Sequence, residues 1–446
     1  MVDGASPSSA GGQDAGASGG PLAGYTVLDI SQMIAGPVGT ALLADMGADV
    51  IKVEPIEGES TRHLLPLVPK ESPAFVMMNR GKRSLPLNLA TEAGREVLAR
   101  LVAKADVVVV GYRPDVCRRL GLTYDDLRAH NESLVYLQNT AFGPRGPMAE
   151  QGGYDIIVQG LSGLVALNGG VDAEGQPRQI IPAIADYMTG GLIAWAVTAA
   201  LLHREKTGEG QEVETSLLSS ALVSQLGRVR RFEMLDAERH ASMLDEIAEL
   251  RGKGAPWTEQ LATNAAARVI LGNIYYRGYA SADSYILVAC LNNPTRGQFL
   301  NVTGLSDFRM VDEFLTLPDD PDAAFREQVD ALVAEAESTM RSRTTADWIA
   351  DFVEAHVPAG PLLFPEEIFD DPQIAANDYL VALDHHALGP YLTAAAPVRM
   401  SATPLPPLRT APLFGEHSAE ILASMGYSEA ETQALIDARI VAARES

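Results

Sequence analysis

One acidic residue, Asp186, interrupts the apolar segment IPAIADYMTGG at residues 181–191. It directly precedes a long run of small and apolar residues that predicts a helix. A structural interpretation makes Asp186 the N-cap of that helix, where backbone N–H groups and the helix dipole would lower its pKa and keep it ionised. A chemical interpretation makes it a nucleophile, because an ionised carboxylate in apolar surroundings can attack an acyl carbon. The residues around Asp186 leave both interpretations open.

Basic residues gather in two short segments of an otherwise acidic chain. NRGKRS, at residues 79–84, contains Lys82 and Arg83, and CRRLG, at residues 117–121, contains Arg119. Each segment fits either ion pairing with neighbouring acids at the surface or a binding site for an anion such as phosphate. The two alternatives cannot be separated from these segments alone.

The first predicted strand-to-helix turn, ISQMIAGPVGT at residues 30–40, lies where open α/β sheets bind ligands. It lacks the GxGxxG spacing, so it does not predict a dinucleotide site. The adjacent His385 and His386 have no third ligand at a suitable spacing, and no metal site is predicted. We therefore expect no tightly bound cofactor.

The composition predicts a soluble globular protein with an acidic surface. Its 446 residues include 58 acidic and 34 basic ones, a formal net charge of -24, which disfavours nucleic acid and anionic membranes as partners. The longest apolar run, GGLIAWAVTAALL at 190–202, is too short to span a bilayer. The two cysteines, Cys117 and Cys290, provide no disulfide framework. The first twenty residues also lack the features of a signal peptide, so we expect a cytoplasmic location.

Strand and helix patterns alternate along the first half of the chain. YTVLDI, DVIKVE, DVVVVGY and LVYLQNTAFG predict strands, and the segments between them predict helices. This alternation predicts an α/β fold with an open parallel sheet. Further on, YYRGYASADSYILVACL predicts a β-hairpin with SADS as its turn. We expect a disordered extension at 1–20, the first part of a large domain at 21–228, a small α+β domain at 229–358, and a return connection with the rest of the large domain at 359–446.

Several segments, taken in order along the chain, resemble one known family. They are VLDISQMIAGPVGTALLADMGADVIKVEP, NRGKRSLPLNL, AIADYMTGG, HREKTGEGQEVETSLL and PLFGEHSAEILASMGYS. From about Tyr25 to Val441 the chain is similar to the class III CoA-transferases, the group of the formyl-CoA and carnitine CoA-transferases. The resemblance implies a Rossmann-like large domain built from both chain ends, and a homodimer of two interlocked rings.

The resemblance implies that Asp186 is the nucleophile. It would attack the donor acyl-CoA to give a mixed aspartyl anhydride and CoA thiolate, and the thiolate would then form an aspartyl-CoA thioester. The acceptor carboxylic acid would take over this CoA through a second anhydride. Anhydrides hydrolyse unless water is excluded, which the apolar surroundings would achieve. Gly190 and Gly191 would let the start of the helix approach an acyl oxygen and donate backbone N–H groups to it.

The resemblance also assigns apolar and aromatic contacts to CoA. Met33 and Ala35 match positions that line the nucleotide pocket in the first strand-to-helix turn. Leu87 and Leu89 match apolar contacts around the adenine, and Tyr112 matches an aromatic contact. These residues are therefore expected to form the CoA-binding surface.

The phosphate contacts carry over less completely. Arg119 matches a basic residue near the phosphates, but Ala90 and Pro55 stand where the family often has a lysine and an arginine. We therefore expect Arg119, together with Lys82 or Arg83, to bind the phosphates. The glycine run that covers the active site of the formyl-CoA enzymes is absent here, which argues against formyl-CoA and oxalate as substrates. The apolar residues near Asp186 favour an acyl group with a hydrocarbon part over formate or oxalate.

Tyr154 and Asp155, in GGYDII, match a pair close to the reacting acyl group. The racemases of this superfamily have a histidine at the position of Tyr154, because racemisation needs one base on each face of the α-carbon. A tyrosine is a poor partner base at neutral pH, so the sequence favours transfer over racemisation. An intramolecular CoA transfer and a non-catalytic CoA-binding protein remain as alternatives, the second opposed by the presence of Asp186.

Overall fold

The computed structural model describes residues 19–265, 272–312, 314–316 and 322–444, so residues 1–18 of the predicted N-terminal extension lie outside the described residues. Its main feature is a six-stranded sheet with the order β3-β2-β1-β4-β5-β6, in which every neighbouring pair is parallel. The order reverses between β1 and β4, which is where doubly wound sheets open a ligand crevice at the carboxyl ends of their strands. The strands are β1 (Thr26–Ile30), β2 (Asp49–Glu54), β3 (Arg83–Pro86), β4 (Val107–Val110), β5 (Val135–Thr140) and β6 (Gln211–Ser216).

Strand β4 shows why this sheet has helices on both faces. All four of its residues are valines and all are buried. Val107 and Val109 contribute to one hydrophobic core, and Val108 and Val110 contribute to the other. A strand buried on both faces reads as a continuous apolar run, as parallel sheets require.

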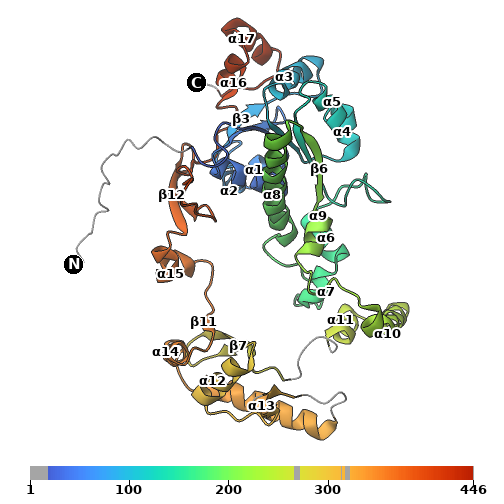
Figure 1. Cartoon of the computed structure of the whole chain (residues 1–446), viewed down its shortest axis with the longest axis vertical. Coiled ribbons are helices and arrows are strands. Elements are labelled where there is room, and N and C mark those ends of the chain that lie inside the picture. The colour runs from blue at the N-terminus through green and yellow to red at the C-terminus, as the bar shows by residue number, and fades with distance from the viewer. Residues whose placement is uncertain (1–18, 266–271, 313, 317–321, 445–446) are drawn as a thin grey trace, which may run out of the picture. The chain divides into compact units, whose positions relative to one another are not determined.

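The two cores are built by different helices. On one face, α1 (Ala35–Asp45) and α8 (Ile184–Thr207) pack on the sheet, and on the other α3 (Glu92–Val102) packs together with the C-terminal α16 (Ser418–Ser424). Figure 1 shows this second group, which places the end of the chain beside its first third. The remaining helices of this part are η1 (Ser60–His63), α2 (Pro73–Met78), α4 (Pro114–Leu120), α5 (Tyr124–Arg128), α6 (Asp155–Leu161), α7 (Leu164–Asn168), α9 (Leu217–Val223) and α17 (Glu429–Asp437).

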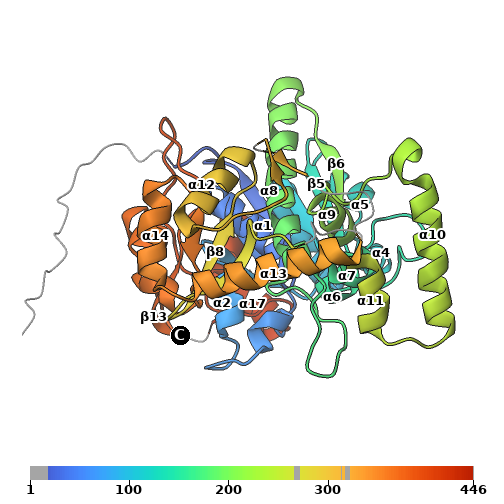
Figure 2. The ribbon, with the colours of Figure 1, turned by 90° about the horizontal axis from the view of Figure 1, so that it is seen from below.

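Glycines bring α1 and α8 into close contact (Figures 1 and 2). A Cβ atom on Gly39 would lie 2.7 Å from the Ile193 side chain, and one on Gly190 would lie 2.8 Å from the Val38 side chain. Real Cβ atoms do not approach other atoms so closely, because such contacts are repulsive. The two helices therefore depend on glycine where they cross.

Helix α8 is apolar on more than the face that packs on the sheet. Ile193, Val197 and Leu201 lie in the core, whereas Trp195 is 70% exposed and Leu202 is 56% exposed. By length and composition this one helix among the described residues could cross a membrane, so the expectation that its apolar run is too short was wrong. Burial of one face against the sheet makes it a core helix of this fold.

The second compact unit comprises Ser242–Ala375, and the first comprises Met1–Ala241 and Ala376–Ser446. The predicted hairpin is confirmed: β7 and β8 pair antiparallel with Ser281–Ser284 as the turn. The domain boundaries given above remain predictions. The elements of the second unit, with the helices at its two ends, are α10 (Glu233–Gly252), α11 (Trp257–Ala265), β7 (Tyr276–Ala280), β8 (Tyr285–Ala289), α12 (Asn293–Thr303), β9 (Met310–Val311), β10 (Phe314–Leu315), α13 (Ala323–Met340), α14 (Thr345–Glu354), β11 (Ala359–Pro361), η2 (Glu367–Asp370) and α15 (Pro372–Ala376).

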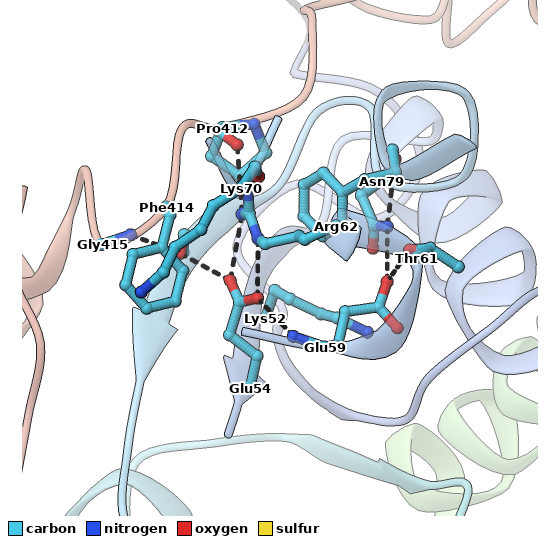
Figure 3. Close-up of polar contacts among 12 residues, drawn as sticks. Lys52, Glu54, Glu59, Thr61, Arg62, Lys70, Asn79, Pro412, Phe414 and Gly415 are labelled. Carbon is cyan, nitrogen blue, oxygen red and sulfur yellow. Dashed lines mark hydrogen bonds and ion pairs between the residues drawn. The ribbon is translucent and has the colours of Figure 1, made fainter. Parts of the chain in front are cut away.

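The returning chain forms the hairpin β12 (Leu380–His385) and β13 (Gly389–Ala394) and then completes a buried charge cluster in the first unit (Figure 3). Arg62 bonds Glu54 and Glu71 and also donates to the carbonyl oxygen of Pro412 over 3.3 Å. The backbone N–H of Phe414 donates to Glu71 over 2.9 Å. The C-terminal segment thus supplies polar partners to charges on the first third of the chain.

Candidate functional site

A cavity of about 330 Å³ opens at the carboxyl ends of β1, β4 and β5, where the strand order reverses. Residues at the end of each of these strands, or in the turn that follows it, line the cavity. Side chains and backbone from the segment before α6, and Asp186 at the start of α8, close the other side. The lining residues that the argument below uses are Gln32, Met33, Ala35, Tyr112, Arg113, Asn139, Tyr154 and Asp186.

The cavity brings together five residues that the sequence had singled out: Met33, Ala35, Tyr112, Tyr154 and Asp186. They come from positions more than 150 residues apart in the chain. Tyr154 is 62% exposed, whereas burial raises the pKa of Tyr112, which packs partly against the sheet core. A solvent-accessible cavity with a carboxylate in its wall has the form expected of a small-molecule site.

Asp186 is not the N-cap of α8, as the structural interpretation had it. The helix begins at Ile184 and its N-cap is Ala183, so Asp186 lies inside the first turn. The carboxylate of Asp155 takes the capping role: one of its oxygens accepts the N–H of Ala185 at 2.8 Å and that of Asp186 at 3.3 Å. The side chain of Asp186 is thereby left to face the cavity.

The pKa of Asp186 is raised to about 7, first by burial and second by the negative charge of Asp155. The expectation that helix capping lowers this pKa was therefore wrong. The backbone N–H groups of Ala185 and Asp186, at the start of α8, are bonded to Asp155 and do not stabilise the Asp186 carboxylate. A carboxylate desolvated beside a like charge holds its proton more tightly.

Asp155 is buried, with 7% of its surface exposed, and it is not among the residues that line the cavity. Gln159 donates to its second carboxylate oxygen. The same Gln159 amide donates to the carbonyl oxygen of Ile180 over 3.0 Å and accepts the N–H of Ile180 over 2.8 Å. Asp155 was expected to be catalytic, but this geometry makes it a positioning residue that fixes the start of α8.

Lys82, expected at the CoA phosphates, lies inside the fold. Its ammonium donates to Asp29 over 2.7 Å, to Asn79 over 2.8 Å and to the carbonyl oxygen of Pro37 over 2.9 Å. Burial lowers its pKa to about 8, although Asp29 opposes the shift. An ammonium group has three N–H donors, and interior acceptors take all three, so no donor remains for a phosphate. We therefore withdraw the assignment of Lys82 to the CoA phosphates.

The other predicted CoA contacts divide into two groups. Arg83 pairs with Asp49 and Glu420 beside the sheet edge, and Leu87 and Leu89 belong to a hydrophobic core, so none of these three lines the cavity. In this structure all three make structural contacts, and their assignment to CoA stays a prediction. Arg119 is exposed on α4 and forms no ion pair with any residue that the structure describes.

The proposed backbone donors at Gly190 and Gly191 do not reach the cavity. Both lie beyond the first turn of α8, where helical N–H groups bond the carbonyl four residues earlier. Gly190 is instead the contact with Val38 on α1. Gly191 is exposed, with no neighbour near the place of a Cβ atom. Neither glycine can donate to an acyl oxygen.

Sequence reasoning missed polar lining residues, among them Gln32, Arg113 and Asn139. All follow or end a parallel strand, and this position was the signal that could have found them. Arg113 forms an exposed ion pair with Asp115 at 2.9 Å. Such a pair contributes little stability, so Arg113 can exchange it for an anionic ligand. Among the described residues, no group of three or more His, Cys, Asp or Glu side chains is arranged to hold a metal ion.

Comparisons with known proteins agree on one family. Residues 22–418 match CoA-transferase family III. The succinate–glutarate CoA-transferase of Agrobacterium fabrum is 31% identical over 91% of this chain and 96% of the relative. The succinyl-CoA:mesaconate CoA-transferase of Haloarcula marismortui is 33% identical over 91% of this chain and 97% of the relative. The formyl-CoA:oxalate CoA-transferase of Rhodopseudomonas palustris is 30% identical over 93% and 96%.

Solved structures give the same result. A CaiB/BaiF family protein from Brucella suis aligns with a TM-score of 0.68 at 29% identity over 91% of this chain and 99% of its own. A Mycobacterium tuberculosis protein aligns with a TM-score of 0.71 at 28% identity, with 91% and 99% coverage. The chain therefore belongs to CoA-transferase family III. It is an enzyme of the class that transfers CoA between acyl-CoA thioesters and carboxylic acids.

Proposed function

We propose that this enzyme transfers CoA from an acyl-CoA to a carboxylic acid through covalent intermediates on Asp186. The observation that carries the proposal is a partly buried carboxylate in the wall of the cavity, with its pKa raised to about 7. A carboxylate with an elevated pKa is more nucleophilic once it is ionised, and at neutral pH a large fraction is ionised. Titration near the working pH is typical of catalytic groups.

The reaction balances without a net proton transfer. An oxygen of Asp186 attacks the thioester carbon, the C–S bond breaks, and a mixed anhydride and CoA thiolate result. The thiolate attacks the aspartyl carbonyl and releases the donor acid, leaving an aspartyl-CoA thioester. The acceptor carboxylate attacks that carbonyl and expels the thiolate, which then attacks the acceptor carbonyl of the second anhydride. Asp186 is released as a carboxylate and the new acyl-CoA leaves.

The position of Asp155 supports the proposed acylation of Asp186. In the free enzyme two carboxylates share the start of α8, and their repulsion contributes to the raised pKa of Asp186. Formation of the anhydride or thioester removes the charge of Asp186, and therefore removes this repulsion. The free enzyme is destabilised relative to the covalent intermediates, which lowers the barrier to reaching them.

We assign the main anion contact of the substrate to Arg113, because it lines the cavity with Asp186. A local cation is needed, since the formal net charge of -24 repels CoA and organic acids alike. Relatives that act on succinate, glutarate and mesaconate support a dicarboxylic acid as one substrate. A dicarboxylic substrate has a second carboxylate group, and this group also needs a cation in the site. The relatives are named as transferases, which supports transfer over racemisation.

We also propose that the enzyme is a homodimer. The exposed apolar side chains of Trp195 and Leu202 on α8 support this, because apolar surface on a core helix is commonly covered by a second subunit. Sedimentation of the purified enzyme at micromolar concentration tests the assembly. A species with the mass of one 47.5 kDa chain would contradict it.

Covalent labelling tests the role of Asp186. The enzyme is incubated with succinyl-CoA alone, treated with borohydride, digested, and analysed by mass spectrometry. Reduction of an aspartyl thioester gives an alcohol, so the peptide that contains Asp186 should lose about 14 Da, the mass difference between a carboxylic acid and a hydroxymethyl group. The Asp186→Asn variant should show no such change and no turnover. Normal turnover by Asp186→Asn would refute the proposal.

A further inference from the structure

Met33 has a backbone conformation that its residue type disfavours. Its φ of 67° lies in the left-handed region, where a side chain clashes with the following carbonyl oxygen and which glycine adopts freely. Met33 lines the cavity in the turn between β1 and α1. Strain of this kind persists only where surrounding structure enforces it, and it concentrates at ligand sites.

A buried carboxylate accepts a hydrogen bond from the backbone of Met33. The backbone N–H of Met33 donates to an oxygen of Glu59 over 3.0 Å. Glu59 is completely buried, and its second oxygen accepts the hydroxyl of Thr61 and the amide of Asn79 (Figure 3). Its own backbone N–H donates to Glu54 over 3.2 Å. Hydrogen bonds from Met33, Thr61 and Asn79 therefore fix both oxygens of the Glu59 carboxylate.

The residue before the turn is fixed in the same way. Lys52 donates to the carbonyl oxygen of Ser31 over 2.6 Å, and the N–H of Ser31 donates to Asp29 over 3.1 Å. Lys52 and Asp29 are completely buried. Buried charges therefore bond the chain on both sides of Gln32, which also lines the cavity.

Burial of the Glu59 carboxylate is costly and is not offset by an ion pair in the described part of the chain. Its hydrogen bond to Met33 is charge-assisted and therefore strong. We propose that Glu59 is a positioning residue for acyl-CoA: it enforces the left-handed conformation of Met33 and so shapes the CoA-binding wall of the cavity. This inference rests on the proposed function for the identity of the ligand.

A double-mutant cycle tests the proposal through CoA binding, which needs no chemistry. Glu59→Leu should weaken CoA binding about tenfold, as expected for loss of a hydrogen bond to a charged group. Glu59→Gln should bind within about threefold of the wild type, because an amide oxygen can still accept the N–H of Met33. In a Met33→Gly background, Glu59→Leu should have little effect, since glycine adopts the turn without an enforcing acceptor.

Thr61→Val is the matched control. It removes a hydrogen bond to the other oxygen of Glu59 and leaves the Met33 contact in place. Equal losses from Glu59→Leu in the wild-type and Met33→Gly backgrounds would overturn the proposal, as would an equal loss from Thr61→Val. Failure of the labelling experiment on Asp186, with the cycle as expected, would remove the catalytic proposal and leave the positioning role intact.

If Glu59→Leu does not fold, the wild-type enzyme labelled with [15N]methionine decides the matter. The Met33 amide is assigned from the signal that disappears in Met33→Leu. A signal displaced downfield and slow to exchange with deuterium would support the bond to Glu59. An amide that exchanges at the rate of an exposed loop would overturn the proposal.

Discussion

Asp186→Asn is expected to stabilise the enzyme, and by more at alkaline pH than at acid pH. In the folded state Asp186 titrates near 7, whereas in the unfolded chain an aspartate titrates at about 3.9. Between these values the folded protein keeps a proton that the unfolded chain releases. Raising the pH therefore favours unfolding of the wild type, and the asparagine variant is free of this effect.

The magnitude follows from the two pKa values. For one site, the advantage of Asp186→Asn is about 1.5 kcal/mol at pH 5 and about 4 kcal/mol at pH 8, an increase of about 2.5 kcal/mol. Because Asp186 is partly exposed to the cavity, water reduces the desolvation and these figures are upper bounds. An increase between about 1 and 2.5 kcal/mol is expected.

Urea unfolding of the wild type and the variant at pH 5 and pH 8 measures this increase. The signal should come from the first compact unit, which contains Asp186, so that unfolding of the second unit is not confused with it. Asp384→Asn makes the same chemical change at an exposed site of the same unit, so its effect at each pH serves as the matched control. An advantage of Asp186→Asn that does not change with pH would show that its pKa is not raised in the folded enzyme.

Two further predictions concern packing and binding. Gly190→Ala should destabilise the first unit by about 1–3 kcal/mol in urea unfolding, because its Cβ would overlap Val38. Gly191→Ala, in the same helix but without a close neighbour, should be neutral or stabilise by up to about 1 kcal/mol, and equal losses at both sites would contradict the packing argument. Arg113→Leu should raise KM for acyl-CoA about tenfold or more. Arg118→Leu removes an exposed arginine outside the cavity wall and should leave KM unchanged, whereas equal effects would refute the assignment.

Local sequence pattern was sufficient for the parallel sheet, but not for all of its strands. The strand Val107–Val110 can be predicted from the sequence, because a short run of valines is typical of a strand that is buried on both faces. Arg83–Pro86 form β3, a short edge strand that pairs only with β2 among the described strands. Its basic residue, Arg83, suggested a phosphate contact. The four residues of the strand do not show which strand it pairs with. Strand β3 is defined by a tertiary pairing, which local pattern does not contain.

The same distinction holds at the site. Asp186 could be found from its neighbours and from family resemblance, but the sign of its pKa shift could not. That sign depends on Asp155, which lies 31 residues away in the chain and takes the N–H groups at the start of α8. Lys82 was misplaced for a similar reason, since its acceptor Asp29 lies 53 residues away. Burial and hydrogen-bond partners are properties of the folded chain.

The returning C-terminal segment has a consequence for synthesis on the ribosome. Glu71 and Ser84 receive the N–H groups of Phe414 and Gly415, which are translated 343 and 331 residues later, respectively. While it is being made, the nascent N-terminal half must leave these acceptors to water or to a chaperone. Contacts of such long sequence separation form late. The sheet that carries the turn between β1 and α1 can reach its final state only after nearly the whole polypeptide has emerged.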